Sequence, residues 1–151
     1  MTRSKLVYPE IEPATMMVEE PVALFDTVNN RQDIIGQIKR GLPIQSFDTL
    51  RKEFGVPVPQ LADTLNINPR TLNRRRQSGR LNTDESERVY RLGRLFKIAI
   101  NLFKEENSVR QWFATPKEIF GGETPLRYAD TEPGAQEVEK QLRRLAHGVF
   151  V

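Results

Sequence analysis

Short helical patterns follow one another along this chain from Asn30 to its end, and breaker residues separate them. Within each pattern apolar residues recur at steps of three and four, and no stretch shows the strict alternation of a half-buried strand. Glycine, proline, asparagine or serine interrupts the patterns about every ten to fifteen residues. The chain has 151 residues, 38% of them hydrophobic, which is enough for one compact domain or for a small domain plus an interaction module. An all-α fold of short helices is therefore predicted.

The predicted helical segments differ in how they begin and in what they bury. They cover residues 31–41, 44–55, 59–66, 68–79, 83–105, 107–116 and 132–148, and residues 124–131 form a further short helix or a turn. Ile34, Ile35 and Ile38 share a face of the first segment. The longest segment has Thr83 as its expected N-cap. Its apolar stripe is a candidate dimer face, although core packing accounts for most of it: Val89, Leu92, Phe96, Ile100 and Phe103.

Segments 59–66 and 68–79 have the spacing of a helix-turn-helix, with about four residues between the two helices. Asn68 is a suitable N-cap for the second helix, and Pro69 suits its first position. The opening turn of that helix then carries Arg70 and Thr71 at the surface. The expected apolar core of the pair consists of Leu61, Ala62, Leu65, Ile67 and Leu72.

The second of these helices is rich in arginine. Between Arg70 and Lys97 there are nine basic and three acidic residues, a local balance of +6 in a chain whose formal net charge is +3. A recognition helix enters the major groove with its N-terminal part, while arginines elsewhere neutralise phosphates. A solvated arginine-rich helix is the open alternative. The predicted base-reading residues are Arg70, Thr71, Asn73 and Arg74, and the predicted phosphate contacts are Arg75, Arg76 and Arg80.

Composition weighs against several other classes of protein. The absence of cysteine removes disulfides and thiolate chemistry, and a cytoplasmic location is expected. No run approaches the roughly 20 apolar residues of a membrane span. His147 is the only histidine, and no carboxylate pair or phosphate-binding loop occurs at a recognisable spacing. Neither an enzyme nor a cofactor or metal site is therefore expected, and Trp112 and Phe113 are better explained as core than as a ligand platform.

From Ile35 to the C-terminus, four motifs together resemble the Xre/MbcA/ParS family of antitoxins. They are "GLPIQSFDTL", "LNINPRTLNRRRQSGRL", "GRLNTDESERVYRLGRL" and "WFATPKEIFGGETPLRYADTEPGAQEVEKQLRRLAHGV". The resemblance implies an all-α fold, with a Cro-like helix-turn-helix domain followed by a helical toxin-binding domain. It also implies a partner, a RES-domain toxin that consumes NAD. Glu85, Ser86 and Arg88 match the family's "ESxR" start of the long helix.

Three parts of the chain are predicted, the first from its prolines, acidic residues and lack of a helical period, and the other two from this resemblance. They are an extended or flexible N-terminal arm (1–28), a helix-turn-helix domain (29–82) and a toxin-binding domain (83–151). Thr124 and Thr131 are also suitable N-caps on physical grounds, and Gly134 permits close approach of either a partner or the chain itself. The expected toxin-binding residues are Gly121, Gly122, Thr124, Pro125, Arg127, Thr131, Gly134, Arg143, Arg144, His147, Val149, Phe150 and Val151.

The last three residues form an apolar tail after the final helix. We expect this tail to dock near the active-site cleft of the toxin, with Arg143 or Arg144 supporting the contact. Folding back onto the chain's own domain, or pairing in a homodimer, is the open alternative.

Two functions fit these features. In the first, the chain is an antitoxin that occludes the active site of its toxin and represses its own operon. In the second, it is a stand-alone dimeric helix-turn-helix regulator of transcription. Either function predicts a homodimer on palindromic operator DNA with half-sites about one helical turn apart, and the first places this dimer in a larger assembly with toxin.

Overall fold

The computed structural model describes residues 31–148, which fold into eight α-helices and one short 3-10 helix without a strand. This confirms the predicted all-α fold class. The elements are α2 (Arg31–Arg40), α3 (Gln45–Phe54), α4 (Val58–Thr64), α5 (Pro69–Ser78), α6 (Thr83–Phe103), α7 (Glu106–Ala114), η2 (Glu118–Phe120), α8 (Pro125–Tyr128) and α9 (Glu132–Ala146). The segment 124–131 therefore contains a helix as well as a turn.

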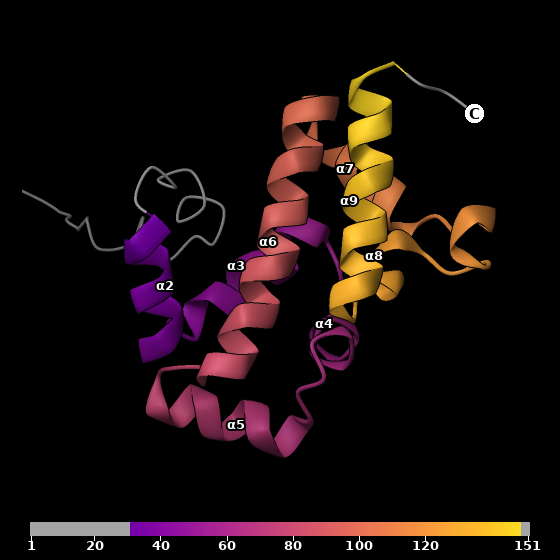
Figure 1. Ribbon diagram of the computed structural model, residues 1–151. Coiled ribbons are helices and arrows are strands. Elements are labelled where there is room, and N and C mark those ends of the chain that lie inside the picture. The colour runs from indigo at the N-terminus through magenta and orange to yellow at the C-terminus, as the bar shows by residue number, and fades with distance from the viewer. Residues whose placement is uncertain (1–30, 149–151) are drawn as a thin grey trace, which may run out of the picture.

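Helix α6 is the element around which the others are arranged. It contacts α2, α3, α7 and α9. Figure 1 shows α6 and α9 side by side, with α5 lying across one end of α6 and the C-terminal end of α9 at the opposite end of the molecule. The C-terminal end of the last helix is therefore held away from α5 by the length of α6.

One hydrophobic cluster runs through the described residues, from Ile34 to Leu142. At its centre, Phe54 packs edge-on against Phe96 and Phe113, with ring centroids 5.3 and 4.9 Å away. Edge-on pairs of this kind stabilise a core beyond the area that they bury. The cluster contains residues from both sides of the expected boundary at residue 82, and that boundary stays a prediction.

The apolar stripe of α6 faces this core. Val89, Leu92 and Phe96 are at most 1% exposed, so the expectation that they form a dimer face is wrong. Only the C-terminal part of the stripe, Ile100 and Phe103, is half-buried. Core packing therefore explains the regular spacing of the stripe.

Two local expectations are also corrected. The N-cap of α6 is Asn82 and not Thr83: the Asn82 side chain accepts from the Glu85 N–H at 2.8 Å, and Glu85 accepts from the Asn82 N–H at 2.9 Å. This reciprocal capping box satisfies two backbone donors that a threonine one residue later would leave free. On α2, Ile34 is buried whereas Ile35 is 46% exposed, so these two isoleucines do not share a face.

Candidate functional site

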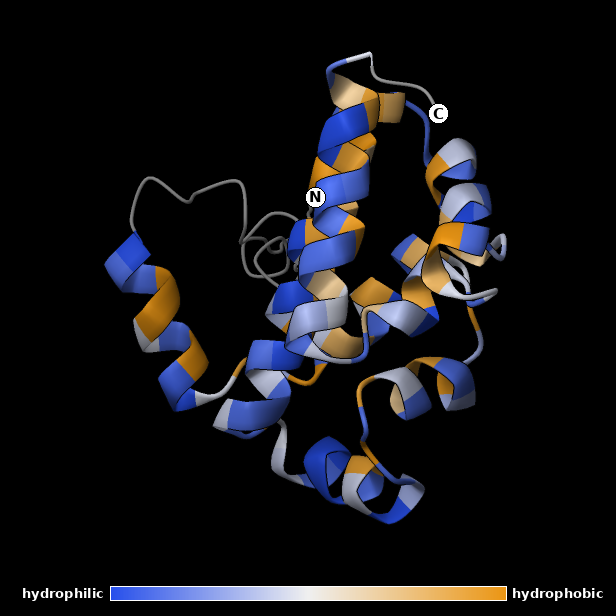
Figure 2. Cartoon of the chain, turned by 45° about the vertical axis from the view of Figure 1, so that its right-hand side comes forward, coloured by the Kyte–Doolittle hydropathy of each residue, from blue (hydrophilic) through white to orange (hydrophobic). Residues whose placement is uncertain are grey.

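The second helix of the helix-turn-helix, α5, begins as its sequence predicts. The Asn68 side chain accepts a hydrogen bond from the Thr71 N–H at 2.8 Å, and Pro69 lies in the first turn. Leu72 is buried, and Gly79 ends the helix with a φ of 87°. Because the cap satisfies a backbone donor at the helix start, the opening turn is held in place at the surface. Figure 2 shows α5 as a largely hydrophilic helix at the lower edge of the molecule.

One side of α5 is open to solvent. Arg70, Asn73 and Arg74 are exposed, and a helix turns by about 100° per residue, which places the three on one side. Within residues 31–148, neither Arg70 nor Arg74 has a side-chain hydrogen bond or ion pair, whereas Thr71 is half-buried. Two uncompensated guanidinium groups therefore project from the part of α5 that is expected to reach bases.

Arg75 lies on a different side of α5 and pairs with α6. Its Nε and Nη2 donate to the two carboxylate oxygens of Glu85 at 2.7 and 3.0 Å. The Glu85 side chain is 6% exposed. Burial raises the pKa of the Glu85 carboxyl, but hydrogen bonds from Arg75 and from the Asn82 N–H outweigh burial and lower that pKa below its usual value. Arg75 thus attaches α5 to the start of α6.

Arg76 makes the corresponding contact with α3. Its Nη1 and Nη2 donate to the two carboxylate oxygens of Asp48, both at 2.9 Å. The guanidinium carbon lies 5.8 Å from the centre of the Phe47 ring. Both partners of this ion pair are more than a third exposed, and the hydrogen bond to Asp48 raises the pKa of Arg76. Arg76 is therefore neutralised within the chain but remains accessible.

Beyond the end of α5, Arg80 lies near two basic residues of α2, Lys39 and Arg40, that the sequence did not indicate for this site. Its Nη1 donates to the Gly41 carbonyl at 2.6 Å. The Thr83 hydroxyl donates to the Lys39 carbonyl at 3.0 Å. The last turn of α2, with exposed Lys39 and Arg40, therefore lies beside the end of α5. In the sequence these two residues are adequately explained as favourable charges at a helix C-terminus, so no local signal marks them.

The "ESxR" residues are structural in this chain. Glu85 pairs with Arg75, as described above. The Ser86 hydroxyl accepts from the Leu42 N–H at 2.8 Å, and Arg88 donates to the Leu65 carbonyl at 2.8 Å. Together these bonds attach the first turns of α6 to the linker before α3 and to the turn of the helix-turn-helix.

The expected toxin-binding residues separate into two groups, and the first surrounds a hollow beside α8 and the start of α9. Arg127, Thr131 and Gly134 line this hollow. Its acidic lining residues are Glu123, Asp130 and Glu137. Thr124 and Thr131 are the predicted N-caps, since they accept from the N–H groups of Arg127 and Gly134 at 3.2 and 3.1 Å.

Three other members of this group have roles within the chain. Gly121 and Gly122 adopt φ values of 67° and 89°, as the predicted chain reversal requires. Pro125 is buried. A Cβ on Gly134 would lie 1.9 Å from the Tyr128 carbonyl oxygen. Of the two explanations for this glycine, internal packing is the one that the geometry supports.

Arg127 connects this group to the helix-turn-helix. Its Nη1 lies 2.6 Å from the Asp63 carboxylate on α4, and both side chains are exposed. Sequence reasoning offers no signal for this contact, because the two residues are 64 positions apart. The hollow therefore adjoins the helix-turn-helix on the side of α4.

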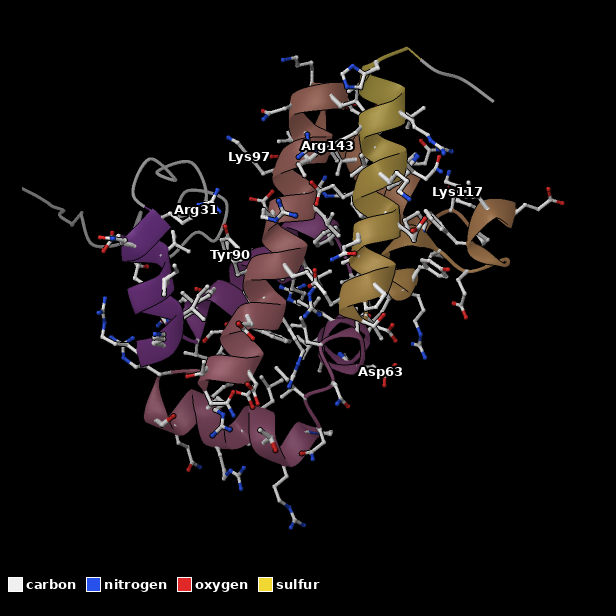
Figure 3. All side chains as sticks on the ribbon, in the orientation of Figure 1. Arg31, Asp63, Tyr90, Lys97, Lys117 and Arg143 are labelled. Carbon is white, nitrogen blue, oxygen red and sulfur yellow. The ribbon has the colours of Figure 1, made fainter. Side chains whose placement is uncertain are left out.

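The second group lies at the far end of α9. Arg143 donates to Glu139 at 2.8 Å, and Glu139 also binds Arg94 of α6. Arg144 and His147 are exposed. Figure 3 shows Arg143 near one end of α9 and Asp63, the partner of Arg127, near the other. The 15 residues of α9 span about 22 Å, so the two groups are well separated. The expected tail, Val149, Phe150 and Val151, lies outside the described residues, as does the expected arm at 1–28.

Two family models match the chain in the order of its motifs. Residues 33–94 match the antitoxin Xre-like helix-turn-helix domain, and residues 99–148 match the antitoxin Xre/MbcA/ParS C-terminal toxin-binding domain. A protein of Yersinia enterocolitica named Antitoxin Xre is 33% identical over 119 residues, which cover 78% of this chain and 80% of that relative. The chain belongs to the Xre/MbcA/ParS family of antitoxins. This confirms the resemblance that its motifs carry.

Two further proteins of the same name are similar to the chain. The Antitoxin Xre of Pseudomonas putida is 35% identical over 97 residues, covering 64% of this chain and 60% of the relative. That of Photorhabdus laumondii is 29% identical over 114 residues, covering 74% and 77%. An Xre-type antitoxin carries a DNA-binding and a toxin-binding domain, so the prediction of a binding protein over an enzyme is confirmed.

None of the helices from α2 to α9 has the length and apolar character that crossing a membrane requires. Between residues 31 and 148, histidine and carboxylate side chains do not gather into a group that could hold a metal ion.

Proposed function

We propose that this antitoxin covers the active site of a RES-domain toxin that consumes NAD, and that it represses its own operon by binding operator DNA through α5. The arrangement of the two candidate surfaces carries this proposal. Uncompensated arginines project from α5, whereas the expected toxin-binding residues lie along α8 and α9. Because these surfaces do not overlap, one molecule can hold DNA and toxin together.

On the DNA side, Arg70, Asn73 and Arg74 reach base edges, and Thr71 supports the opening turn. Arg80 contacts phosphate together with Lys39 and Arg40, which the fold brings beside it. A homodimer places two copies of α5 on a palindromic operator, because one helix-turn-helix covers too little DNA for tight specific binding. Arg75 and Arg76 first hold α5 in position, and any phosphate contact by Arg76 competes with Asp48.

On the toxin side, the hollow beside α8 and the end of α9 contact the toxin together. This assigns residues 29–82 to DNA and residues 83–151 to toxin, with the arm 1–28 outside both. Arg144 and His147 are accessible for such a contact, whereas Arg143 is already paired with Glu139. The tail Val149–Val151 extends this end towards the active-site cleft.

The decisive experiment is co-expression of the histidine-tagged chain with the product of the adjacent gene. Co-purification and rescue of growth are expected if that product is the toxin. The matched control is the same gene product expressed without the antitoxin, which is expected to arrest growth if it is the toxin. Failure of the full chain both to bind and to rescue growth would refute the toxin part of the proposal, and operator binding alone would then indicate a dimeric regulator.

The tail has a separate test. Deleting Val149–Val151 is expected to weaken toxin neutralisation while operator binding stays unchanged, because the tail follows the end of α9 that lies away from α5. Undiminished neutralisation by the truncated chain would exclude the tail from the toxin contact.

A further inference from the structure

The loop between α7 and α8 presents a large apolar side chain to solvent. Ile119 is 56% exposed, and its neighbour Phe120 in η2 is 2% exposed. Phe120 stacks on Tyr128 with 4.7 Å between ring centroids, which fixes the base of the loop. Of the large hydrophobic residues between 31 and 148, only Ile119 and Ile35 are exposed. A single exposed isoleucine is common on protein surfaces and does not by itself indicate a binding site. The conformation of the loop and the charges around Ile119 therefore carry the argument.

The loop is closed by its own backbone. The Lys117 N–H donates to the Glu123 carbonyl at 3.1 Å, and the Gly122 N–H donates to the Lys117 carbonyl at 2.9 Å. Gly121 and Gly122 supply the positive φ values of the reversal. In Figure 1 the loop projects from the body of the molecule beside α8. A loop that is already held in one shape loses little conformational entropy when a partner binds it.

The surroundings of Ile119 resemble the pattern of a protein interface, an apolar centre with a polar rim. Glu118 and Glu123 are exposed beside it. Lys117 covers the root of the loop, with its Nζ 5.4 Å from the centre of the Trp112 ring. The hollow with its acidic lining shares Glu123 with this rim, so the two features form one continuous surface.

We propose that Ile119 is the apolar anchor of the toxin contact, and that it inserts into an apolar pocket of the toxin whose rim carries basic side chains facing Glu118 and Glu123. The inference rests on the proposed function, because its partner is the toxin. Two observations favour the toxin as the partner that binds this loop. The loop lies within the matched toxin-binding domain, and the acidic side chains around Ile119 would repel DNA. The far end of α9 then supports the contact that the loop anchors.

The test compares two isoleucines. The purified product of the adjacent gene, inactivated by substitution, is titrated with the wild-type chain, with Ile119→Ser and with Ile35→Ser. Loss of a buried anchor weakens an interface by tenfold or more, so the dissociation constant of Ile119→Ser is expected to rise at least about tenfold. Ile35→Ser, a matched change on α2, is expected to stay within about twofold of wild type. Both variants are expected to keep the wild-type unfolding temperature and operator affinity, since both side chains are exposed.

The outcomes distinguish the role of Ile119 from the antitoxin function. Equal toxin affinity of Ile119→Ser and wild type overturns the anchor while leaving the antitoxin function intact. An equal loss in Ile35→Ser also overturns it, because the effect is then not specific to the loop. If Ile119→Ser lowers the unfolding temperature, Ile119→Leu decides: tight binding by this variant supports an apolar contact, and weak binding by a stably folded Ile119→Leu overturns it. A wild-type chain that fails to bind refutes the proposed function instead.

Discussion

Two pairs of arginines on α5 differ only in the side of the helix that they occupy, yet their environments are opposite. Arg70 and Arg74 project into solvent without a partner among the described residues. Arg75 and Arg76 flank buried Leu72 and each bind a carboxylate in bidentate fashion, Glu85 on α6 and Asp48 on α3. The charges of the first pair are therefore uncompensated. The charges of the second pair are compensated, and their ion pairs attach α5 to α6 and α3.

This difference shows that a cluster of arginines on a recognition helix does not amount to a uniform cationic surface. The pairs within the chain also differ from each other. Glu85 is buried and belongs to the capping box of α6, whereas Asp48 and Arg76 are both exposed by more than a third. Burial makes the first pair costly to break, and exposure makes the second pair available for exchange with phosphate.

The largest expected effect comes from breaking the buried pair. Glu85→Ala leaves Arg75 without a partner and removes half of the capping box, so the free energy of unfolding is expected to fall by about 2–4 kcal/mol. Urea denaturation monitored by circular dichroism measures it. Glu87→Ala, two residues along the same helix and exposed, is the control, with an expected change within about 0.5 kcal/mol. Similar losses in both variants would show that the Arg75 pair does not hold α5.

The next effect concerns the outward pair. Arg70→Ala is expected to weaken operator binding by about 1–3 kcal/mol and random DNA much less, while stability stays unchanged. Fluorescence anisotropy with both DNAs measures this difference. Arg144→Ala removes another exposed arginine, at the far end of α9, and is expected to leave DNA binding intact. Equal losses on operator and random DNA would place Arg70 on phosphates instead of bases.

The pH dependence of stability sharpens the same comparison. Although burial opposes it, the Arg75 hydrogen bond holds the folded-state pKa of Glu85 below the ordinary 4.5, so its ionised form stabilises the fold above that pH. The difference in unfolding free energy between wild type and Glu85→Gln is therefore expected to be largest near neutral pH. It shrinks as the pH falls from about 4.5 through the lowered pKa. If the difference in unfolding free energy does not change with pH, the substitution acts through the shape of the side chain and not through the charge of Glu85.

The smallest expected effect is a gain. Asp48→Asn releases Arg76 for phosphate, so DNA affinity is expected to rise by up to about fivefold, the equivalent of an exposed ion pair. The slope of log affinity against log salt steepens by about one. The double variant with Arg76→Gln should show no such gain over Arg76→Gln alone, and Asp130→Asn, an exposed carboxylate in the hollow, serves as control. Weaker DNA binding by Asp48→Asn would mean that the pair positions α5 instead of masking a charge.

Much of the fold was predictable because the signals were local. Asn68 and Pro69 begin α5, Thr131 begins α9, and Leu72 faces the core, all as the sequence indicates. Errors arose where neighbouring residues compete for one role. Asn82 takes the cap expected of Thr83, because its side chain and that of Glu85 satisfy each other's backbone donors.

The candidate site was less predictable than the fold. The sequence indicates that the arginines of α5 are concentrated there, but it does not show which of them face carboxylates on α3 and α6. It also gives no sign that Arg127 meets Asp63, or that Lys39 lies beside the end of α5. Among the expected toxin-binding residues, Gly134 is needed for packing against Tyr128. The exposure of Ile119 beside buried Phe120 has no signal in the sequence.

By itself, the sequence determined the all-α class, the helix-turn-helix and the family, because helix periods, caps and motifs depend on residues within a few positions of one another. The tertiary structure alone decided which charges are free and which are compensated. The compensated charges form three ion pairs between residues that are 10, 28 and 64 positions apart: Arg75–Glu85, Arg76–Asp48 and Arg127–Asp63. Their formation depends on how α3, α4, α5, α6 and α8 pack. The strength of a charge follows from its burial and its partner, and both exist only once the chain has folded.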